Sequence, residues 1–221
     1  MTALTEANYL GDVLKFELDN NQSREQVTVL AGESLVMGEV VGKITKSTPT
    51  TGTADTENTG VGTCTGVTAG ALTEVGTYTL TVVTAPSAST GVSGEIEVKN
   101  PDGVTLPLAE VGTAYVNDQI NFTVNDSGVD FIVGDSFTIA VAAGSNKVVA
   151  LDLTAVNGAQ DAYGIMIAAY GDTGDVQGVA IVRDAQIEAT YLTWPSGFTT
   201  DQKNAALAQL ATQHIAQRYD A

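Results

Sequence analysis

The chain has 221 residues, enough for one large or two small domains, and 26 acidic against nine basic residues give a net charge of -17. A chain this acidic repels phosphate groups, so we expect no nucleic-acid partner and no anionic membrane partner. Its single cysteine, Cys64, excludes an internal disulfide.

The beginning of the chain has no basic segment followed by an apolar one, so we expect no signal peptide. No apolar run approaches the ~18 residues of a membrane-spanning helix. We therefore expect a soluble protein that is made in a cytoplasm. Plentiful Gly, Thr, Val and Ala with few aromatics favour β-structure with many tight turns.

Residues 1–26 are polar and mixed in charge, and their sparse apolar residues follow no long period. Such a segment buries too little surface to offset its chain entropy, so we expect it to be mobile when free and to order against a partner. In residues 27–45, short β-branched runs broken by glycines predict two or three strands. The Thr- and Gly-rich run at 46–66 predicts a linker or a loose edge.

Residues 65–145 alternate apolar and polar side chains, as half-buried strands do. The predicted inward-facing residues are Tyr78, Leu80, Val82, Ile96, Val98, Ile120, Phe122, Val124, Phe137, Ile139 and Val141. Six or seven short strands in about eighty residues predict a small β-sandwich of the immunoglobulin-like kind.

Residues 147–194 again read as strands, with a short buried strand at 163–169 and one long strand or hairpin over 177–194. Residues 27–45 are too few to form a domain, so we expect them to pair with 147–194. The sandwich is then an insertion into a loop, where insertion costs little.

A helix follows Trp194, the only tryptophan, and Pro195, which favours an extended Trp194 and ends the preceding strand. Thr199 and Gln202 fit a capping box at the helix start. The predicted helix carries Arg218 in its last turn. Its predicted apolar stripe consists of Leu207, Leu210, Ala211, His214 and Ile215.

Residues suited to chemistry are few. His214, the only histidine, falls on or beside the helix stripe, and Cys64 falls in a Gly/Thr loop, so a Cys–His catalytic pair has no support. The carboxylate pairs Asp172–Asp175 and Asp126–Asp130 have ligands for a weak calcium site but fit ordinary turns better. No zinc, phosphate-loop or nucleophile motif occurs, so we expect no catalytic residue, no metal and no cofactor.

Three stretches resemble the head decoration proteins of tailed bacteriophages, the family of the lambda capsid-stabilising protein D. They are residues 11–45, residues 147–169 and residues 180–218, of which the last is the most specific because strand, Trp-Pro corner and helix come in the family's order. Short members of the family lack a counterpart of residues 46–146, as an insertion predicts.

The resemblance implies a β-rich, β-tulip-like base domain with one C-terminal helix. It implies a homotrimer on the outside of the expanded capsid, bound to the major capsid protein and resisting the pressure of packaged DNA, with no enzymatic activity. We therefore expect residues 1–26 to be a capsid-binding arm, residues 27–46 and 147–221 to be a discontinuous base domain, and residues 47–146 to be the inserted immunoglobulin-like sandwich.

The hypothetical capsid contacts on the arm are Tyr9, Leu10, Val13, Leu14 and Phe16. The hypothetical subunit or core contacts are Trp194, Pro195, Leu207 and Leu210. One alternative is a displayed binding module, whose sandwich recognises a host glycan or cell surface. A hydrolase built on a carboxylate pair is a further, weaker alternative.

Overall fold

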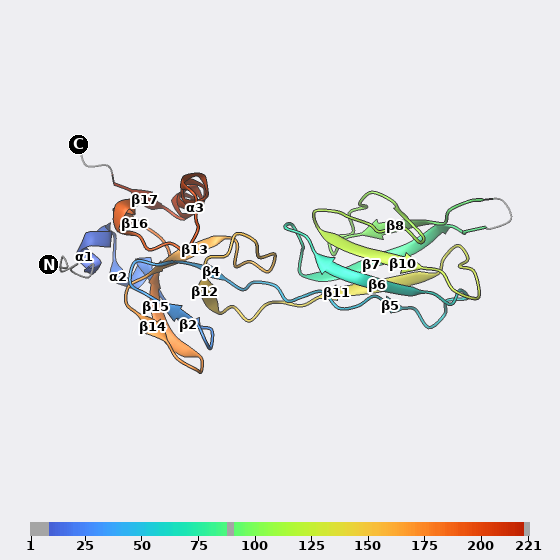
Figure 1. Cartoon of the computed structure of the whole chain (residues 1–221), viewed down its shortest axis with the longest axis horizontal. Coiled ribbons are helices and arrows are strands. Elements are labelled where there is room, and N and C mark those ends of the chain that lie inside the picture. The colour runs from blue at the N-terminus through green and yellow to red at the C-terminus, as the bar shows by residue number, and fades with distance from the viewer. Residues whose placement is uncertain (1–8, 88–90, 219–221) are drawn as a thin grey trace. The chain divides into compact units, whose positions relative to one another are not determined.

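The computed structural model describes residues 9–87 and 91–218 (Figure 1). The chain forms two compact units. Unit 1 contains the chain up to Thr45 and again from Asn146, and unit 2 is Lys46–Ser145. As the sequence predicts, the fold is mainly β, with its one long helix near the C-terminus.

Unit 1 is built around a closed five-stranded barrel in the order β12-β2-β15-β13-β4. The barrel strands are β2 (Arg24–Val29), β4 (Val40–Lys43), β12 (Val148–Ala150), β13 (Ala162–Met166) and β15 (Val176–Ile181). Strand β12 pairs antiparallel with β4 and parallel with β2, so residues from both sides of unit 2 share one barrel. The short buried strand predicted at 163–169 is confirmed as β13.

A three-stranded sheet in the order β1-β16-β17 lies beside the barrel. Its strands are β1 (Leu14–Glu17), β16 (Ala185–Ile187) and β17 (Ile215–Gln217). Short helices α1 (Leu10–Val13), α2 (Asn20–Ser23) and η1 (Ala189–Tyr191) connect the strands. Helix α3 (Thr200–Thr212) packs against β17 of this sheet and β13 of the barrel. Strands β3 (Ser34–Leu35) and β14 (Tyr170–Gly171) form a separate antiparallel pair.

Helix α3 begins as predicted. The Thr199 N–H donates to Gln202 Oε1 at 2.8 Å, and the Gln202 N–H donates to Thr199 Oγ1 at 3.3 Å. The predicted C-terminal end is wrong, because the helix stops at Thr212 and Arg218 lies beyond β17. His214 takes φ 61°, which turns the chain so that Ile215 pairs with β16 instead of extending the helical stripe.

The long strand or hairpin predicted over 177–194 is also wrong. Strand β15 ends at Ile181 in the barrel, and β16 begins at Ala185 in the other sheet. Asp184 lies between them with φ 50°, a left-handed conformation that redirects the chain. The strand ends at Ile187, well before Trp194, because the chain then turns through η1.

Residues 9–26 bury more surface than their sequence pattern predicts. Val13 is fully buried in the cluster that contains Ile187 and Leu210. Strand β1 pairs with β16, and residues 24–26 belong to β2. The reason is that single apolar residues such as Val13 find long-range partners that no local period reveals. Residues 1–8 of the predicted arm lie outside the described residues.

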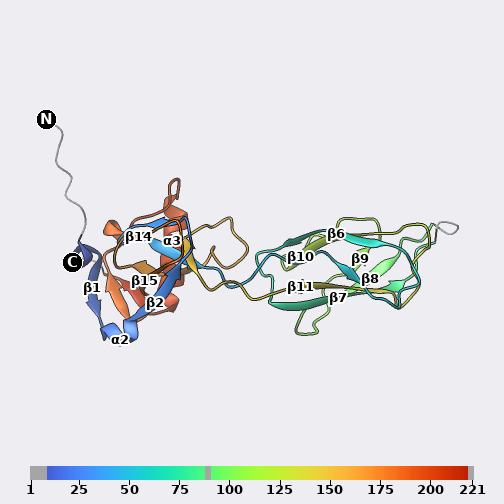
Figure 2. The ribbon, with the colours of Figure 1, turned by 90° about the horizontal axis from the view of Figure 1, so that it is seen from below.

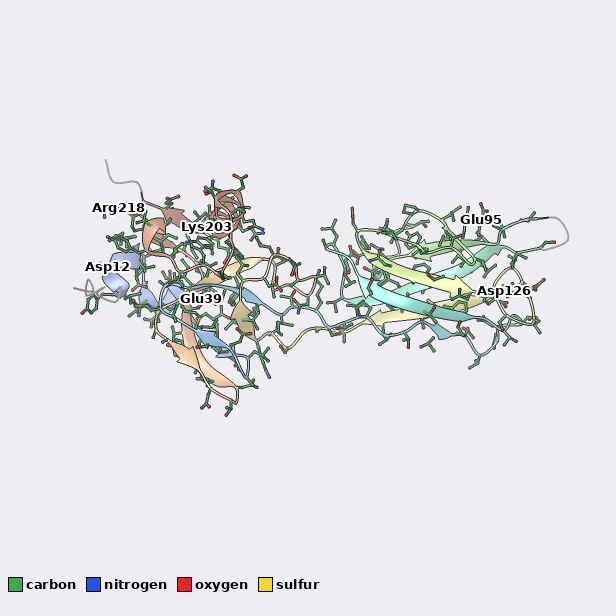
Figure 3. All side chains as sticks on the ribbon, viewed as in Figure 1. Asp12, Glu39, Glu95, Asp126, Lys203 and Arg218 are labelled. Atoms are coloured by element: carbon green, nitrogen blue, oxygen red, sulfur yellow. The ribbon has the colours of Figure 1, made fainter. Side chains whose placement is uncertain are left out.

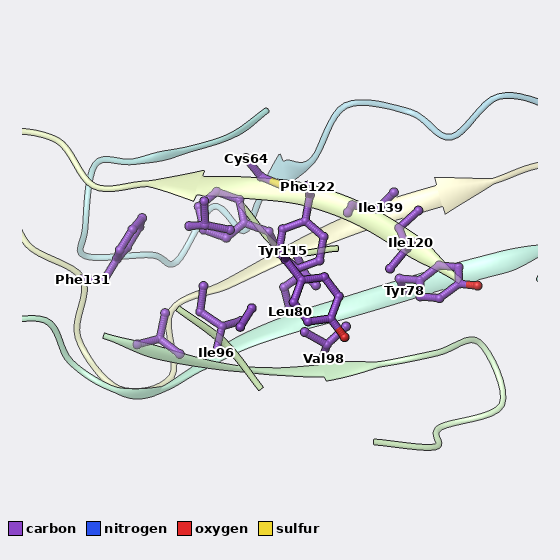
Figure 4. Close-up of a cluster of buried hydrophobic side chains, with 14 of the residues drawn as sticks. Cys64, Tyr78, Leu80, Ile96, Val98, Tyr115, Ile120, Phe122, Phe131 and Ile139 are labelled. Atoms are coloured by element: carbon purple, nitrogen blue, oxygen red, sulfur yellow. The ribbon is translucent and has the colours of Figure 1, made fainter. Parts of the chain in front are cut away.

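Unit 2 consists of two antiparallel sheets around one core (Figure 4). One sheet pairs β6 (Thr63–Ala69) with β10 (Ile120–Asn125). The other has the order β5-β11-β7-β8-β9, with β5 (Thr53–Ala54), β7 (Gly76–Thr84), β8 (Glu95–Lys99), β9 (Ala109–Glu110) and β11 (Ser136–Val141). All the predicted inward-facing residues are buried, which confirms the alternation pattern.

The run at 46–66 is more ordered than its composition predicts. Lys46 forms a bridge with Ala143, β5 pairs with β11, and Cys64 lies in β6 with its side chain in the core. The predicted Gly/Thr loop around Cys64 is therefore wrong. Threonines and glycines suit an edge of this kind because the outer face of the strand remains in water.

Candidate functional site

The reactive side chains of Cys64 and His214 belong to different units. Cys64 is buried, and burial raises the pKa of its thiol to about 11, so the thiol stays protonated at neutral pH. His214 belongs to the other unit, where its Nδ1 lies 3.1 Å from Asp184 Oδ1. Across residues 9–87 and 91–218, no group of three or more His, Cys, Asp and Glu is arranged to hold a metal.

The acidic turns are held by local hydrogen bonds. Asp172 Oδ1 accepts from the backbone N–H and hydroxyl of Thr173, and Asp126 Oδ1 accepts from the Ser127 N–H. Asp175 pairs with Lys147 at 2.5 Å, and this contact lowers the pKa of its carboxyl group. The contacts of Asp172 and Asp126 are those of ordinary turns, whereas Asp175 has partners that are distant in sequence, Lys147 and the Ala31 N–H. No helix in the described chain is long and apolar enough to span a bilayer.

The most exposed apolar region of unit 1 surrounds strand β1. In the described chain β1 pairs only with β16, so its other edge has no strand beside it. Strand β1 lies at the margin of unit 1 (Figure 2). Phe16 on this strand is 53% exposed and Leu18 just after it is 64% exposed. An unpaired edge with apolar side chains is a surface on which another chain can add a strand.

Three contacts hold this edge in place. Buried Val13 anchors the chain before β1, and its carbonyl accepts from the Glu188 N–H at 2.8 Å. Glu17 forms a two-point ion pair with Arg24 at 2.9 and 2.6 Å, which ties β1 to β2. The hydrogen bond to Glu17 raises the pKa of Arg24, so the guanidinium stays protonated. The edge is thus preformed.

The five predicted arm contacts have different environments. Tyr9 and Phe16 are exposed, Leu10 and Leu14 are half-buried, and Val13 is in the core. Val13 is therefore unsuited to a capsid contact unless unit 1 opens. Asp12, which Figure 3 labels, lies in the same region, and its Oδ2 accepts a hydrogen bond from the Tyr9 N–H at 2.8 Å.

Two exposed residues beside β1, Leu18 and Tyr191, are absent from the predicted contacts. The sequence could have indicated the first but not the second. Leu18 lies just after β1 and continues the two-residue apolar spacing of Leu14 and Phe16, so its position follows from the sequence. Tyr191 is 42% exposed, and its ring lies 5.6 Å from Lys15 Nζ. It reaches the region through η1, far along the chain, and no local pattern indicates this.

The four predicted packing residues all belong to unit 1. Leu210 is fully buried and Leu207 is half-buried against the same cluster. Trp194 stacks on Phe198 with ring centroids 6.1 Å apart. Pro195 is half-buried and lines a groove of about 650 Å³ beside the loop that begins at Asp152.

A second groove, of about 480 Å³, lies between α3 and β17. It is lined by Asn204, Leu207, Ala208, Ala211, Ala216 and Gln217. Three of these are exposed alanines, whose small side chains allow close approach of a neighbouring surface. Unit 1 therefore has two distinct apolar regions, one at each outer strand of the three-stranded sheet.

The described chain is thus a mainly β protein whose strand edges present apolar side chains. Comparison with known proteins identifies the family. The family model described as bacteriophage lambda head decoration protein D matches residues 3–215. The chain belongs to this family and is a structural protein of the bacteriophage capsid.

No curated protein matches the chain. Two crystal structures of Xanthomonas campestris FlgL match with 16% and 17% sequence identity. They cover 49% and 54% of this chain, with TM-scores of 0.33 and 0.31. The chain spans about a third of each FlgL chain (34% and 33%), and similarity at this level carries no argument about function.

Proposed function

We propose that this protein binds the outside of the expanded phage head as a homotrimer, contacts the major capsid protein and stabilises the shell against internal DNA pressure. Membership of the decoration family supports binding to the head. The observation that supports the proposed mode of attachment is the unpaired edge of β1. The net charge of -17 suits an outer surface that has no contact with the genome.

Attachment uses β1 and the residues that flank it. A capsid segment that pairs with the free edge forms main-chain hydrogen bonds, and it covers the exposed side chains of Phe16 and Leu18. Burial of apolar surface contributes about 25 cal/mol per Å² before the costs of ordering. Tyr9 and Leu10 extend the same contact, whereas Val13 stays in the core and holds the edge in position.

The groove between α3 and β17 is our proposed subunit contact. A cyclic trimer joins two different surfaces of neighbouring subunits, and the groove would be one of them. It lies beside β17, at the opposite edge of the three-stranded sheet from β1, so its use leaves the β1 edge available to the shell. The trimer then presents three copies of the β1 edge to the shell. Three weak contacts made together give an avidity far above that of one contact.

Co-sedimentation with expanded empty capsids tests the attachment. Phe16→Ser with Leu18→Ser should abolish binding while Tm and solution mass stay unchanged, because both side chains are exposed. The matched control is Val36→Ser, a 42% exposed apolar residue elsewhere in unit 1. Equal binding by the double variant and the control would show that attachment uses another surface.

Analytical ultracentrifugation of the free protein tests the trimer separately. Ala208→Glu with Ala211→Glu should yield a folded monomer, since the two added carboxylates could be buried in the groove only at a large desolvation cost. Asn204→Glu, at the rim of the same groove, is the milder control. A wild-type protein that is monomeric on and off the shell would contradict the trimer.

Recognition of a host glycan by unit 2 has less support than capsid attachment. Sugar recognition uses exposed aromatic rings, and the five aromatic residues of unit 2 are all buried. They are Tyr78, Tyr115, Phe122, Phe131 and Phe137. We therefore retain capsid decoration as the proposed function of the chain.

A further inference from the structure

One end of unit 2 carries a cluster of exposed apolar residues. The chain enters and leaves this unit at Lys46 and Ser145. Strand β11 runs from Ser136 toward that connection, so the loop before Ser136 lies at the opposite end. Strand β10 also ends there, with Asn125 opposite Thr63 at the start of β6.

Two loops at this end present four exposed aliphatic side chains. Val61 is 60% exposed, Val129 is 50%, Ile132 is 48% and Val133 is 63%. The Val61 N–H donates to the Val129 carbonyl at 3.0 Å, so the two loops are joined directly. We call Val61, Val129, Ile132 and Val133 the distal tip.

Buried residues hold the distal tip in one conformation. Asp135 is 4% exposed and accepts hydrogen bonds from three backbone N–H groups, those of Thr59, Gly60 and Ile132, at 2.8–3.0 Å. These bonds clamp the loop before β6 to the loop before β11. A preorganised surface loses little entropy when it binds a partner.

Phe131 supports the two loops from below. It lies at one end of the core, away from Tyr78, and its ring contacts Phe137 edge-on at 5.6 Å (Figure 4). Gly60 and Gly62 pack directly against it, and a Cβ at either position would collide with the ring. The large aromatic therefore fills the core, while the four aliphatic side chains above it remain in water and are unnecessary for core packing.

The surroundings of the distal tip are acidic. Asp55, Glu57, Asp126 and Asp130 lie on the same two loops, and Figure 3 labels Asp126 and Glu95 at this end of unit 2. The sequence of unit 2 has only two basic residues. Lys46 donates to the carbonyls of Ala71 and Thr73, and Lys99 pairs with Glu97 at 2.8 Å. Neither lysine of unit 2 lies on the loops of the tip.

We propose that the distal tip is a docking surface for another protein whose contact patch has apolar side chains surrounded by lysine or arginine. Exposed apolar clusters with polar rims mark interaction sites, and the acidic rim selects a basic partner. A second copy of the same tip is unsuitable because the two acidic rims would repel. A glycan lacks the apolar surface to cover four aliphatic side chains, and this surface has no exposed aromatic ring.

The test uses the full chain and a fluorescent extended peptide of alternating Leu and Lys as the probe. Fluorescence anisotropy should show saturable binding that weakens with added salt. Ile132→Ser with Val133→Ser should weaken binding at least tenfold. The matched control, Leu72→Ser with Val104→Ser, removes two apolar side chains that are 64% and 57% exposed elsewhere in unit 2, and should leave binding unchanged.

Two further probes separate the apolar and ionic contributions. A Ser/Lys peptide should bind at least tenfold more weakly than the Leu/Lys peptide, and a Leu/Glu peptide should show no binding. Equal loss in the tip and control variants would overturn the proposal, because binding would then not depend on the tip. Equal binding of the Ser/Lys and Leu/Lys peptides would also overturn it, because charge alone would then account for binding. Tip-dependent binding of a bacterial surface polysaccharide, or of zwitterionic vesicles, would also overturn it.

Discussion

The two units of this chain bury their strands in different ways. In unit 1, adjacent residues of one strand enter different clusters: Val40 packs with Leu210, whereas Val41 packs with Val148. In unit 2, alternate residues of each strand enter one cluster and the others face water. Alternation is therefore visible in the sequence of unit 2 and hidden in unit 1, where both strand faces are covered.

The two units also differ in how they accommodate a buried carboxylate. Glu39 in unit 1 accepts one backbone N–H, from Val36, and burial raises its pKa. Burial would also raise the pKa of Asp135 in unit 2, but its three N–H donors lower the pKa overall. The number of donors, and not burial alone, decides which carboxylate is stable as an anion.

Removal of residues 46–145 is the largest change that tests whether the units are separable. The Ile44 N–H donates to the Lys147 carbonyl at 3.0 Å, and the Asn146 N–H donates to the Ile44 carbonyl at 2.8 Å. Asn146 already has φ 57°, a turn conformation, so Thr45 joined to Asn146 should close a short hairpin.

We expect the shortened protein to lose the unfolding transition of unit 2 and to keep that of unit 1. Trp194, the only tryptophan, reports unit 1 by fluorescence during denaturation in urea. A second variant with Gly-Gly between Thr45 and Asn146 controls for a strained junction. Loss of the tryptophan transition in both variants would mean that unit 1 depends on unit 2.

Single cavities in the two cores should act on one unit each. Ile139→Ala and Leu210→Ala both remove a fully buried side chain and should each cost roughly 2–5 kcal/mol. Tryptophan fluorescence should shift to lower urea for Leu210→Ala and stay unchanged for Ile139→Ala. Hydrogen exchange of β7 and β11 should show the reverse. Coupled shifts would contradict the independence of the units.

Asp135→Asn should destabilise unit 2 by about 1–3 kcal/mol, because the amide NH₂ cannot accept the N–H groups that the carboxylate accepts. The folded pKa of Asp135 is below its unfolded value of about 3.9. Its stabilisation is therefore complete above about pH 4 and declines as pH falls through the folded pKa. Urea unfolding of unit 2 from pH 7 to pH 3 should show this decline in wild type and a flatter profile in the variant.

Glu39→Gln should have the smallest effect and the opposite pH dependence. The folded pKa of Glu39 is raised, so unit 1 is stabilised below the unfolded pKa and loses that stability as pH rises through the folded pKa. The amide can still accept the Val36 N–H, so we expect a gain of under about 1 kcal/mol at pH 7. Tryptophan-monitored unfolding at pH 5 and pH 7 measures it, and a clear loss at pH 7 would contradict the sign.

The sequence by itself determined the features that depend on neighbouring residues. The alternation around Leu80, Phe122 and Ile139 identifies the buried faces of unit 2, and Thr199 with Gln202 identifies the start of α3. Family membership also follows from the sequence, through stretches on both sides of unit 2. Such features are local, because a strand alternates and a helix is capped within a few residues.

Only the tertiary structure decided where distant segments meet. The left-handed residues Asp184 and His214 end β15 and α3, because the next residues find partners in a different sheet. Val13 is a core residue because Ile187 and Leu210 reach it from far along the chain. The loops of the distal tip likewise meet through Asp135, about seventy-five residues from Gly60. Long-range pairing of this kind depends on the whole fold, and no short window of sequence contains it.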